Sequence, residues 1–214
     1  MALPNATLLV APNCLYCHSM TTILETLQKK GLLGELRIID VSHNPEEAET
    51  RGVRGVPWTQ IGVFEFQGLH TEKELAQWIK KAGSNTGLGD YIDYLLTNGQ
   101  LSLVSRLVAR NPTWLESVIL LLDRPDLGLN TRIGISAVIE SLQGSRELVA
   151  VVDRLGILTK SSDSQKRADA CYYLGLSQDS GAIVYIEPLL KDDNTEVREI
   201  ARESLDLLRQ EIKP

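Results

Sequence analysis

The sequence contains few cysteines, which excludes one way of stabilising a small protein. Only 3 occur among 214 residues, too few for the disulfide network of small secreted domains. Cys14 and Cys17 lie three positions apart, whereas Cys171 is far from both. In a chain without a disulfide network, a pair at this spacing points to redox chemistry or to a bound group.

Long apolar runs and an excess of positive charge are also missing. No stretch approaches the roughly 20 apolar residues that cross a membrane, and the longest candidate is Val118 to Leu122. The 22 Lys and Arg residues are outnumbered by 28 Asp and Glu residues, for a net charge of −6. Binding to nucleic acid requires the opposite balance. We therefore expect neither a membrane nor a nucleic acid as partner. No secretory signal is visible at the N-terminus, so the expected compartment is cytoplasmic.

The composition is that of a folded protein, and the chain changes character once. Hydrophobic residues make up 43% and charged residues 23%, both ordinary values for globular proteins. A small and polar stretch, Gly83 to Gly87, separates two regions, and such a composition is typical of a linker. The region 1–83 carries 8 basic and 9 acidic side chains, against 14 and 19 in the remainder. We predict one domain over 1–83, a linker over 84–87 and a second domain over 88–214.

The first domain alternates between strand and helix patterns. Short apolar or alternating runs at 7–10, 36–41, 57–61 and 63–67 predict strands, and helical spacing follows near residues 15, 45 and 71. The predicted order is β-α-β-α-β-β-α. A parallel β-α-β unit requires a crossover helix, and the last two strands fit a hairpin.

The cysteine pair stands where the first helix is expected to open. Helix N-termini favour negative charge and lower the pKa of a thiol. We expect Cys14 to be the exposed nucleophile, and Cys17 to be shielded and able to resolve a mixed disulfide. Two alternatives stay open. Cys14 to His18 also spells C-x-x-C-H, the attachment signal of c-type haem, and His18 with His43 or His70 would complete a zinc site.

These features resemble the thioredoxin superfamily, and the stretch 1–82 has the size of a glutaredoxin. The glutaredoxin pair Cys-Pro-Tyr-Cys is similar to Cys14-Leu15-Tyr16-Cys17, and Gly55-Val56-Pro57 stands where the superfamily has a proline with a cis peptide bond. The resemblance implies a thiol–disulfide oxidoreductase of this fold. It implies that Cys14 and Cys17 are catalytic, and that substrate is contacted by Tyr16, Val56, Pro57 and Gly68.

Two departures from glutaredoxin concern glutathione. Gly68 matches the first glycine of the glutaredoxin Gly-Gly turn, but Leu69-His70 follows it. Ala11-Pro12-Asn13 lacks the basic residue that glutaredoxins place before the first cysteine. Both departures argue against specific glutathione binding and leave a protein disulfide as the expected substrate. This interpretation requires neither a cofactor nor a metal ion.

The second domain shows helical patterns and an internal repeat. Three positions recur at one constant offset, namely Arg167, Ala170 and Leu174, which return as Arg198, Ala201 and Leu205. A repeat unit as short as the spacing from Arg167 to Arg198 cannot bury an apolar face alone. Such units therefore stack into a solenoid.

The stretch from about 160 to 210 resembles HEAT repeats, whose Asp and Arg residues form structural ladders. We therefore expect four side chains to stabilise the stack without a catalytic role, namely Asp163, Arg167, Asp193 and Arg198. The resemblance implies an all-α HEAT-like domain that binds a protein client.

The expected function is that of a thiol–disulfide oxidoreductase acting on a protein disulfide, with the helical repeats holding the client. The alternative is a non-catalytic adaptor in which the thioredoxin-like domain is vestigial.

Overall fold

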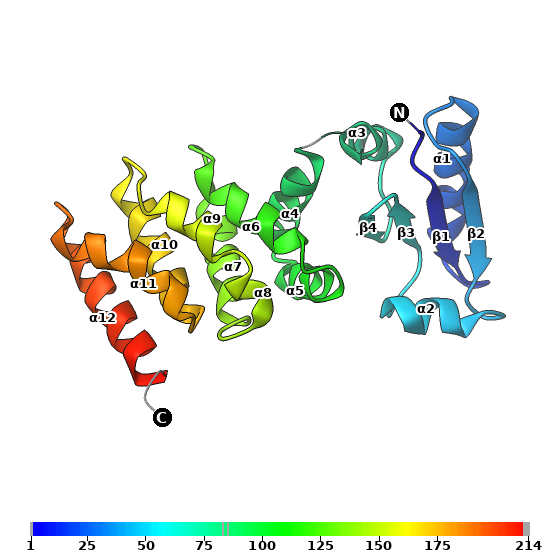
Figure 1. Cartoon of the computed structure of the whole chain (residues 1–214). Helices are drawn as coiled ribbons and strands as arrows, with labels where there is room; N and C mark the ends of the chain where they lie inside the picture. The colour runs from blue at the N-terminus through cyan, green and yellow to red at the C-terminus, as the bar shows by residue number, and fades with distance from the viewer. Residues whose placement is uncertain (1, 83, 85, 212–214) are drawn as a thin grey trace. The chain divides into compact units, whose positions relative to one another are not determined.

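A computed structural model of the protein describes residues 2–82, 84 and 86–211 (Figure 1). The chain divides into two compact units, Met1–Asp90 and Tyr91–Pro214. The predicted linker at 84–87 includes residue 85, which lies outside the described residues, so that the linker stays a prediction. Its last residue, Gly87, is the first residue of α4 (Gly87–Thr97).

The first unit has the predicted order of strands and helices. The expected β-α-β-α-β-β-α order is confirmed, with strand ends that shift by one or two residues. The elements are β1 (Ala6–Val10), α1 (Cys17–Lys29), β2 (Leu36–Asp40), α2 (Pro45–Arg51), β3 (Trp58–Ile61), β4 (Phe64–Gln67) and α3 (Glu72–Ala82).

The sheet topology brings two predicted site segments to one edge. The strand order is β2-β1-β3-β4. β1 runs parallel to β2, and β3 runs antiparallel to β1 and β4. In this register Leu9 lies opposite Trp58. The turn that follows β1 and the segment that precedes β3 therefore leave the sheet at the same edge, although they are far apart in the sequence.

Two helices cover the sheet and hold that edge in place. α1 contacts β1, β2 and α3, while α3 contacts β3 (Figure 1). Leu24 of α1 and Leu75 of α3 are fully buried, and each such side chain contributes about 1.5–3 kcal/mol to folding. The Thr71 hydroxyl accepts a hydrogen bond from the Glu74 amide at 3.2 Å, so the predicted cap of α3 is present. The site is thus built on a packed α/β layer.

The second unit is all-α over its described residues. No helix in the described part of the chain is both long and apolar enough to span a membrane. After α4 the helices are α5 (Leu101–Arg110), α6 (Trp114–Leu120), η1 (Leu121–Asp123), α7 (Leu129–Glu140), α8 (Arg146–Val149), α9 (Val152–Leu158), α10 (Ser164–Leu176), η2 (Ser180–Ala182), α11 (Ile183–Ile186), η3 (Glu187–Lys191) and α12 (Thr195–Glu211).

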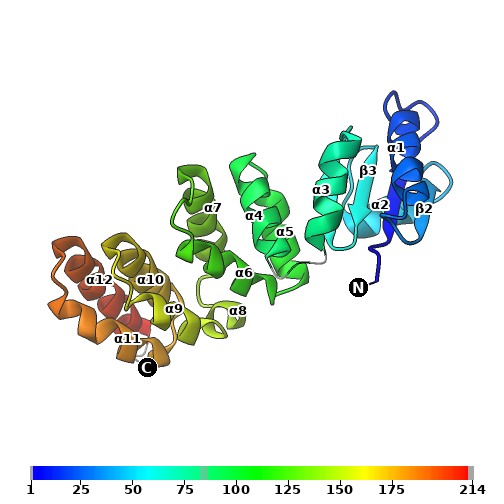
Figure 2. The same ribbon diagram turned by 90° about the horizontal axis from the view of Figure 1, so that it is seen from above.

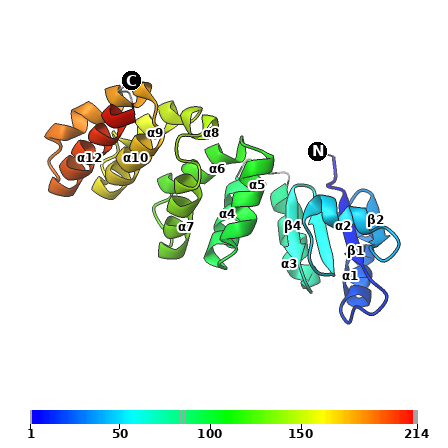
Figure 3. The same ribbon diagram turned by 90° about the horizontal axis from the view of Figure 1, so that it is seen from below.

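The longer helices of this unit lie next to one another. α4, α7, α10 and α12 follow in a row in Figures 2 and 3. Hydrogen bonds join successive members, namely Thr131 Oγ1 to Asp93 Oδ1 (2.6 Å), Ser136 Oγ with Tyr173 Oη (2.7 Å) and Ser204 Oγ to the Cys171 carbonyl (3.2 Å). A polar contact therefore joins each of these helices to the next, as in stacked repeats.

The sequence repeat has an equivalent in the bonding. Arg167 Nη1 donates to carbonyl oxygens five and six positions earlier, and Arg198 Nη1 does the same one repeat later. The acceptors are Ser161 and Ser162 in the first repeat, and Asp192 and Asp193 in the second. Residues 163 and 194 also accept from backbone amides at the starts of α10 and α12. The unit thus fits a helical repeat domain.

The main carboxylate partner of Arg167 is an aspartate that the sequence-based prediction did not name, Asp192. Asp193, expected among the stabilising residues, is 91% exposed and meets Arg167 only through Nη2, at 2.8 Å. Asp192, 7% exposed, accepts from Nε and Nη2 of Arg167, each at 2.7 Å. The Arg167 guanidinium holds the pKa of Asp192 below its ordinary value, and that pair raises the pKa of Arg167. Two adjacent aspartates look equivalent in sequence, and only the direction of the backbone after η3 decides between them.

Candidate functional site

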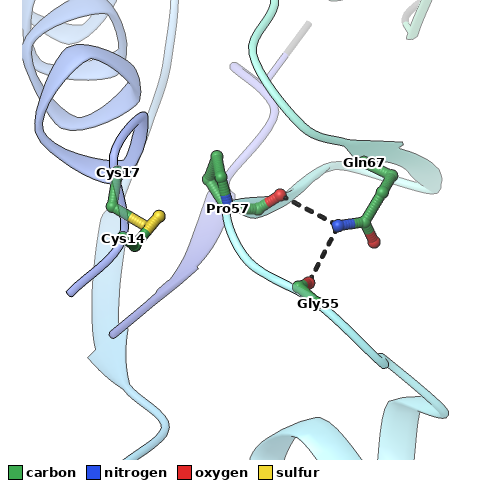
Figure 4. Close-up of a disulfide and its surroundings, with 5 residues drawn as sticks. All are labelled: Cys14, Cys17, Gly55, Pro57 and Gln67. Atoms are coloured by element: carbon green, nitrogen blue, oxygen red, sulfur yellow. Dashed lines mark hydrogen bonds between the residues drawn. A yellow bond between two sulfur atoms is a disulfide. The ribbon is translucent and has the colours of Figure 1, made fainter. Parts of the chain in front are cut away.

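Cys14 and Cys17 form a disulfide beyond the end of β1 (Figure 4). Their sulfur atoms are 2.07 Å apart and their Cα atoms 5.4 Å apart. The amide of Cys14 donates to the Ala11 carbonyl at 3.3 Å, and the amide of Cys17 donates to the Cys14 carbonyl at 3.4 Å. Two consecutive turns therefore carry the chain from the sheet to α1 and bring the two sulfurs together.

The helix begins later than the sequence pattern indicates. α1 starts at Cys17, with Tyr16 as the residue before it, and Met20 makes a helical hydrogen bond back to Tyr16. The prediction that Cys14 opens the helix is wrong by three positions. The reason is that the Ala11 and Cys14 carbonyls close tight turns first, and Leu15 is left 81% exposed. Cys17 lies in the first helical turn, and Cys14 precedes it.

The two cysteines differ in accessibility. Cys17 is shielded as expected, at 5% exposed, whereas Cys14, which was expected to be exposed, is half-buried. Between them, Tyr16 remains 49% exposed. An incoming sulfur atom can therefore reach Cys14 more easily than Cys17, and the segment between the cysteines presents large side chains to it.

The peptide bond between Val56 and Pro57 is cis, which confirms the sequence expectation. Pro57 is buried and Val56 half-buried. In Figure 4 the proline ring lies beside the disulfide, on the side away from Gln67. The structure thus brings Val56-Pro57 and the cysteine pair together, as the resemblance implied.

Gln67, the last residue of β4, is a site residue that the sequence did not reveal. Its Nε2 donates to the Gly55 carbonyl at 2.9 Å and to the Pro57 carbonyl at 3.4 Å (Figure 4). Both acceptors belong to the loop that carries Val56. The residue type gave no signal, because a glutamine at the end of a strand is ordinary and its partners depend on the β3–β4 register.

The loop after β4 closes the site on another side. Gly68 has a positive φ of 86°, which favours glycine, and its amide donates to the Pro57 carbonyl at 2.8 Å. The amide of His70 lies 3.3 Å from the sulfur of Met20 in α1. The short loop after β4 therefore contacts Pro57 through Gly68 and the start of α1 through His70. Leu69, between these two residues, is 48% exposed.

His70 anchors the loop through both ring nitrogens. Nδ1 lies 2.9 Å from Glu74 Oε1, and Nε2 lies 3.2 Å from the Gln67 carbonyl oxygen. The side chain is mostly buried. A histidine four positions before a glutamate at a helix start is the one sequence sign of this contact. His70 is thus engaged in holding the loop.

The haem and zinc alternatives both require free sulfur atoms. In this structure each sulfur is bonded to the other. His43 instead lies in an exposed loop, 3.5 Å from Asp40. Hydrogen bonds from Ser42 hold the pKa of Asp40 below its ordinary value. Among the described residues, no group of three or more His, Cys, Asp or Glu side chains could hold a metal ion.

Comparison with known families supports the assignment of the first unit. Residues 6–80 match a family model described as a thioredoxin domain. This stretch contains both cysteines, Pro57 and Gln67. No curated protein matches the chain. The N-terminal region is therefore a thioredoxin-like domain with a close Cys14–Cys17 pair, followed by helices that fit a helical repeat domain.

Proposed function

We propose that the protein is a thiol–disulfide oxidoreductase that acts on protein disulfides through Cys14 and Cys17. The observation that carries this proposal is the disulfide between a half-buried cysteine and a buried one, beside Pro57. An exchange reaction needs this asymmetry, because one sulfur must meet the client and the other must complete the reaction from inside.

The reaction consists of two exchanges. In the reduced protein the Cys14 thiolate attacks one sulfur of the client disulfide, so that a Cys14–client disulfide forms and the other client sulfur leaves as a thiolate. Cys17 then loses its proton and attacks Cys14, which forms the disulfide seen here and releases the second client thiolate. The client gains two electrons and, after protonation, two thiol protons. A small dithiol or another thiol reductant must restore the protein.

The rim of the site supports a protein client over glutathione. Leu15 and Tyr16, the two residues between the cysteines, are exposed large side chains, and so is Leu69 in the loop after β4. Exposed apolar groups gain most from contact with other apolar groups. The charged ends of glutathione would gain little from this rim. Protein segments that flank a cysteine offer apolar side chains more often.

The proposed role of the helical unit is to hold the client. Its support is an exposed apolar stripe on α7, where Leu129 and Ile133 lie one turn apart and are 71% and 59% exposed. Tyr172 of the adjacent α10 is also exposed, and its hydroxyl donates to Glu140 of α7 at 3.2 Å. Tethering the client in this way raises the effective concentration of its disulfide near Cys14.

The test is catalysed reduction of a protein disulfide by dithiothreitol. We expect the full chain to accelerate reduction, and Cys14→Ser to lose roughly a hundredfold or more of that rate because the nucleophile is gone. Cys171→Ala, which changes a cysteine outside the site, serves as the matched control and should keep the rate. If the full chain gives no acceleration, the proposed activity is contradicted and the adaptor alternative is favoured.

A further inference from the structure

We infer that Gln67 is a positioning residue, which holds the Gly55–Pro57 segment so that a peptide client can pair with the main chain of Val56. The inference rests on the proposed function, since it concerns how the same site holds its substrate. It adds a residue that neither the sequence pattern nor the family match assigns.

The geometry of the side chain carries the first step. The β3–β4 hairpin fixes the backbone of Gln67 opposite Trp58. From there one amide nitrogen reaches two carbonyl oxygens, those of Gly55 at 2.9 Å and Pro57 at 3.4 Å (Figure 4). The carbonyls of Gly55 and Pro57 are thus both held by the side-chain nitrogen of Gln67. These two hydrogen bonds fix the main chain of Val56, which lies between them.

The need for such a tie comes from the proline. Pro57 has no amide hydrogen, so it cannot donate to a neighbouring strand. The hydrogen bonding between the β3 and β4 sides of the hairpin continues beyond Trp58 through the bond from the Gly68 amide to the Pro57 carbonyl. Gly55, which is exposed and precedes β3, lies beyond the paired residues. The Gln67 amide therefore extends the support of the hairpin past Pro57 to Gly55.

The consequence falls on Val56. Within the described residues, its amide and its carbonyl make no hydrogen bond, and its side chain is half-buried. Because the carbonyls on either side are held by Gln67, Val56 keeps a fixed pair of main-chain groups next to Pro57, whose ring lies beside the disulfide. An extended peptide can use such groups as a neighbouring strand does. A small aromatic disulfide has no main chain and cannot.

The experiment compares two disulfides that release the same coloured thiol. One is a cysteine peptide joined to 5-thio-2-nitrobenzoate, and the other is 5,5′-dithiobis(2-nitrobenzoate). Each disulfide is mixed in excess with the reduced full chain, and the single-turnover rate of thiol release is measured against disulfide concentration. Here kcat is the limiting rate constant and KM the half-saturating concentration. We expect Gln67→Met to lower the ratio of peptide to small-disulfide kcat/KM by about three- to tenfold, mainly through KM, because one or two hydrogen bonds that fix the binding segment are lost.

Three further variants make the result decisive. Gln67→Glu should lower the ratio further, since a carboxylate faces two carbonyl oxygens. Gln67→Lys keeps a donor of similar reach and should restore part of the ratio. Gln77→Met changes an exposed glutamine of α3 and should leave the ratio unchanged.

An unchanged ratio in Gln67→Met would overturn the inference. So would an equal loss with both disulfides accompanied by a lower melting temperature, which would indicate a purely structural role. If the unsubstituted chain released no coloured thiol from either disulfide, the proposed function itself would fail, and that outcome differs from both of the others.

Discussion

Burial separates the three cysteine side chains of this protein. Cys14 is half-buried, Cys17 is 5% exposed and Cys171 is fully buried in α10. Burial raises the pKa of the Cys171 thiol to about 12, with a smaller opposing effect of the hydrogen bond with Ser204. At pH 8 roughly one in ten thousand Cys171 side chains would be a thiolate, the form that reacts.

The order in which the thiols react with iodoacetamide follows from these environments. After reduction by dithiothreitol at pH 8, we expect Cys14 to be alkylated first, Cys17 more slowly and Cys171 only after unfolding. Peptide mass spectrometry at increasing times measures each site. Labelling of Cys171 in the folded protein as fast as that of Cys14 would contradict the burial of this side chain in α10.

Single residues show how far the sequence could predict the site. The spacing of the cysteines and the Val56-Pro57 dipeptide have recognisable signals, because the chemistry demands those residue types. Gln67 has none, because its role depends on which carbonyls the β3–β4 register places within its reach. The choice between Asp192 and Asp193 has the same character: adjacent identical residues acquire different roles only when the backbone turns one of them inward.

At the scale of elements, the strands were the easier part to predict. Apolar runs bounded by Gly and Pro marked all four, because a half-buried sheet needs them. The start of α1 was harder. Helical spacing of apolar residues extends back to Leu15, but two hydrogen-bonded turns occupy residues 11–17 and delay the helix to Cys17. Local turns and helices compete for the same backbone groups, and the sequence pattern does not show which prevails.

The contact between α10 and the segment after η3 gives a prediction about stability. Asp192→Ala leaves the guanidinium of Arg167 without its two-point partner in a mostly buried position, and should destabilise the helical unit by about 3 kcal/mol. Asp193→Ala is the matched control, because its carboxylate is 91% exposed, and should cost less than about 1 kcal/mol. Urea denaturation of the full chain, followed by circular dichroism, measures both. Equal losses in the two variants would contradict the assignment.

The same contact predicts a dependence on pH. Arg167 lowers the pKa of Asp192 in the folded protein, whereas an unfolded aspartate titrates near a pKa of about 3.9. The unfolded chain therefore takes up this proton first, so that the stabilisation is complete above about pH 4 and declines as the pH falls further. Asp192→Asn should lose less stability than the unsubstituted chain between pH 4 and pH 2. A parallel decline in both proteins would show that other groups control acid unfolding.

For the whole molecule, the two units divide the proposed work. Both cysteines, Val56-Pro57 and Gln67 belong to the first unit. The proposed client surface lies on α7 and α10 of the second unit. The chemistry and the selection of a client should therefore be separable.

Removal of the helical unit tests this division. We expect residues 1–83 to fold and to reduce a small disulfide at the rate of the full chain. A Cys17→Ser variant of this fragment should capture fewer of the cellular proteins that the same variant of the full chain captures. Mass spectrometry of the captured proteins provides the comparison. An insoluble fragment would mean that the two units share a core, and an identical set of captured proteins would remove client selection from the helical unit.

The most direct measurement follows the first bond of the proposed exchange. The reduced Cys17→Ser full chain is mixed with a linear peptide dimer joined by one disulfide, so that the leaving peptide thiolate diffuses away, and its intact mass is measured under non-reducing conditions. We predict a mass increase of one peptide, located on Cys14, because the hydroxyl that replaces the Cys17 thiol cannot release it. Cys14→Ser should gain no peptide, and the unsubstituted chain should accumulate none because Cys17 resolves the intermediate. Absence of the adduct on Cys14, or an equal adduct in the Cys14→Ser variant, would contradict a Cys14 nucleophile.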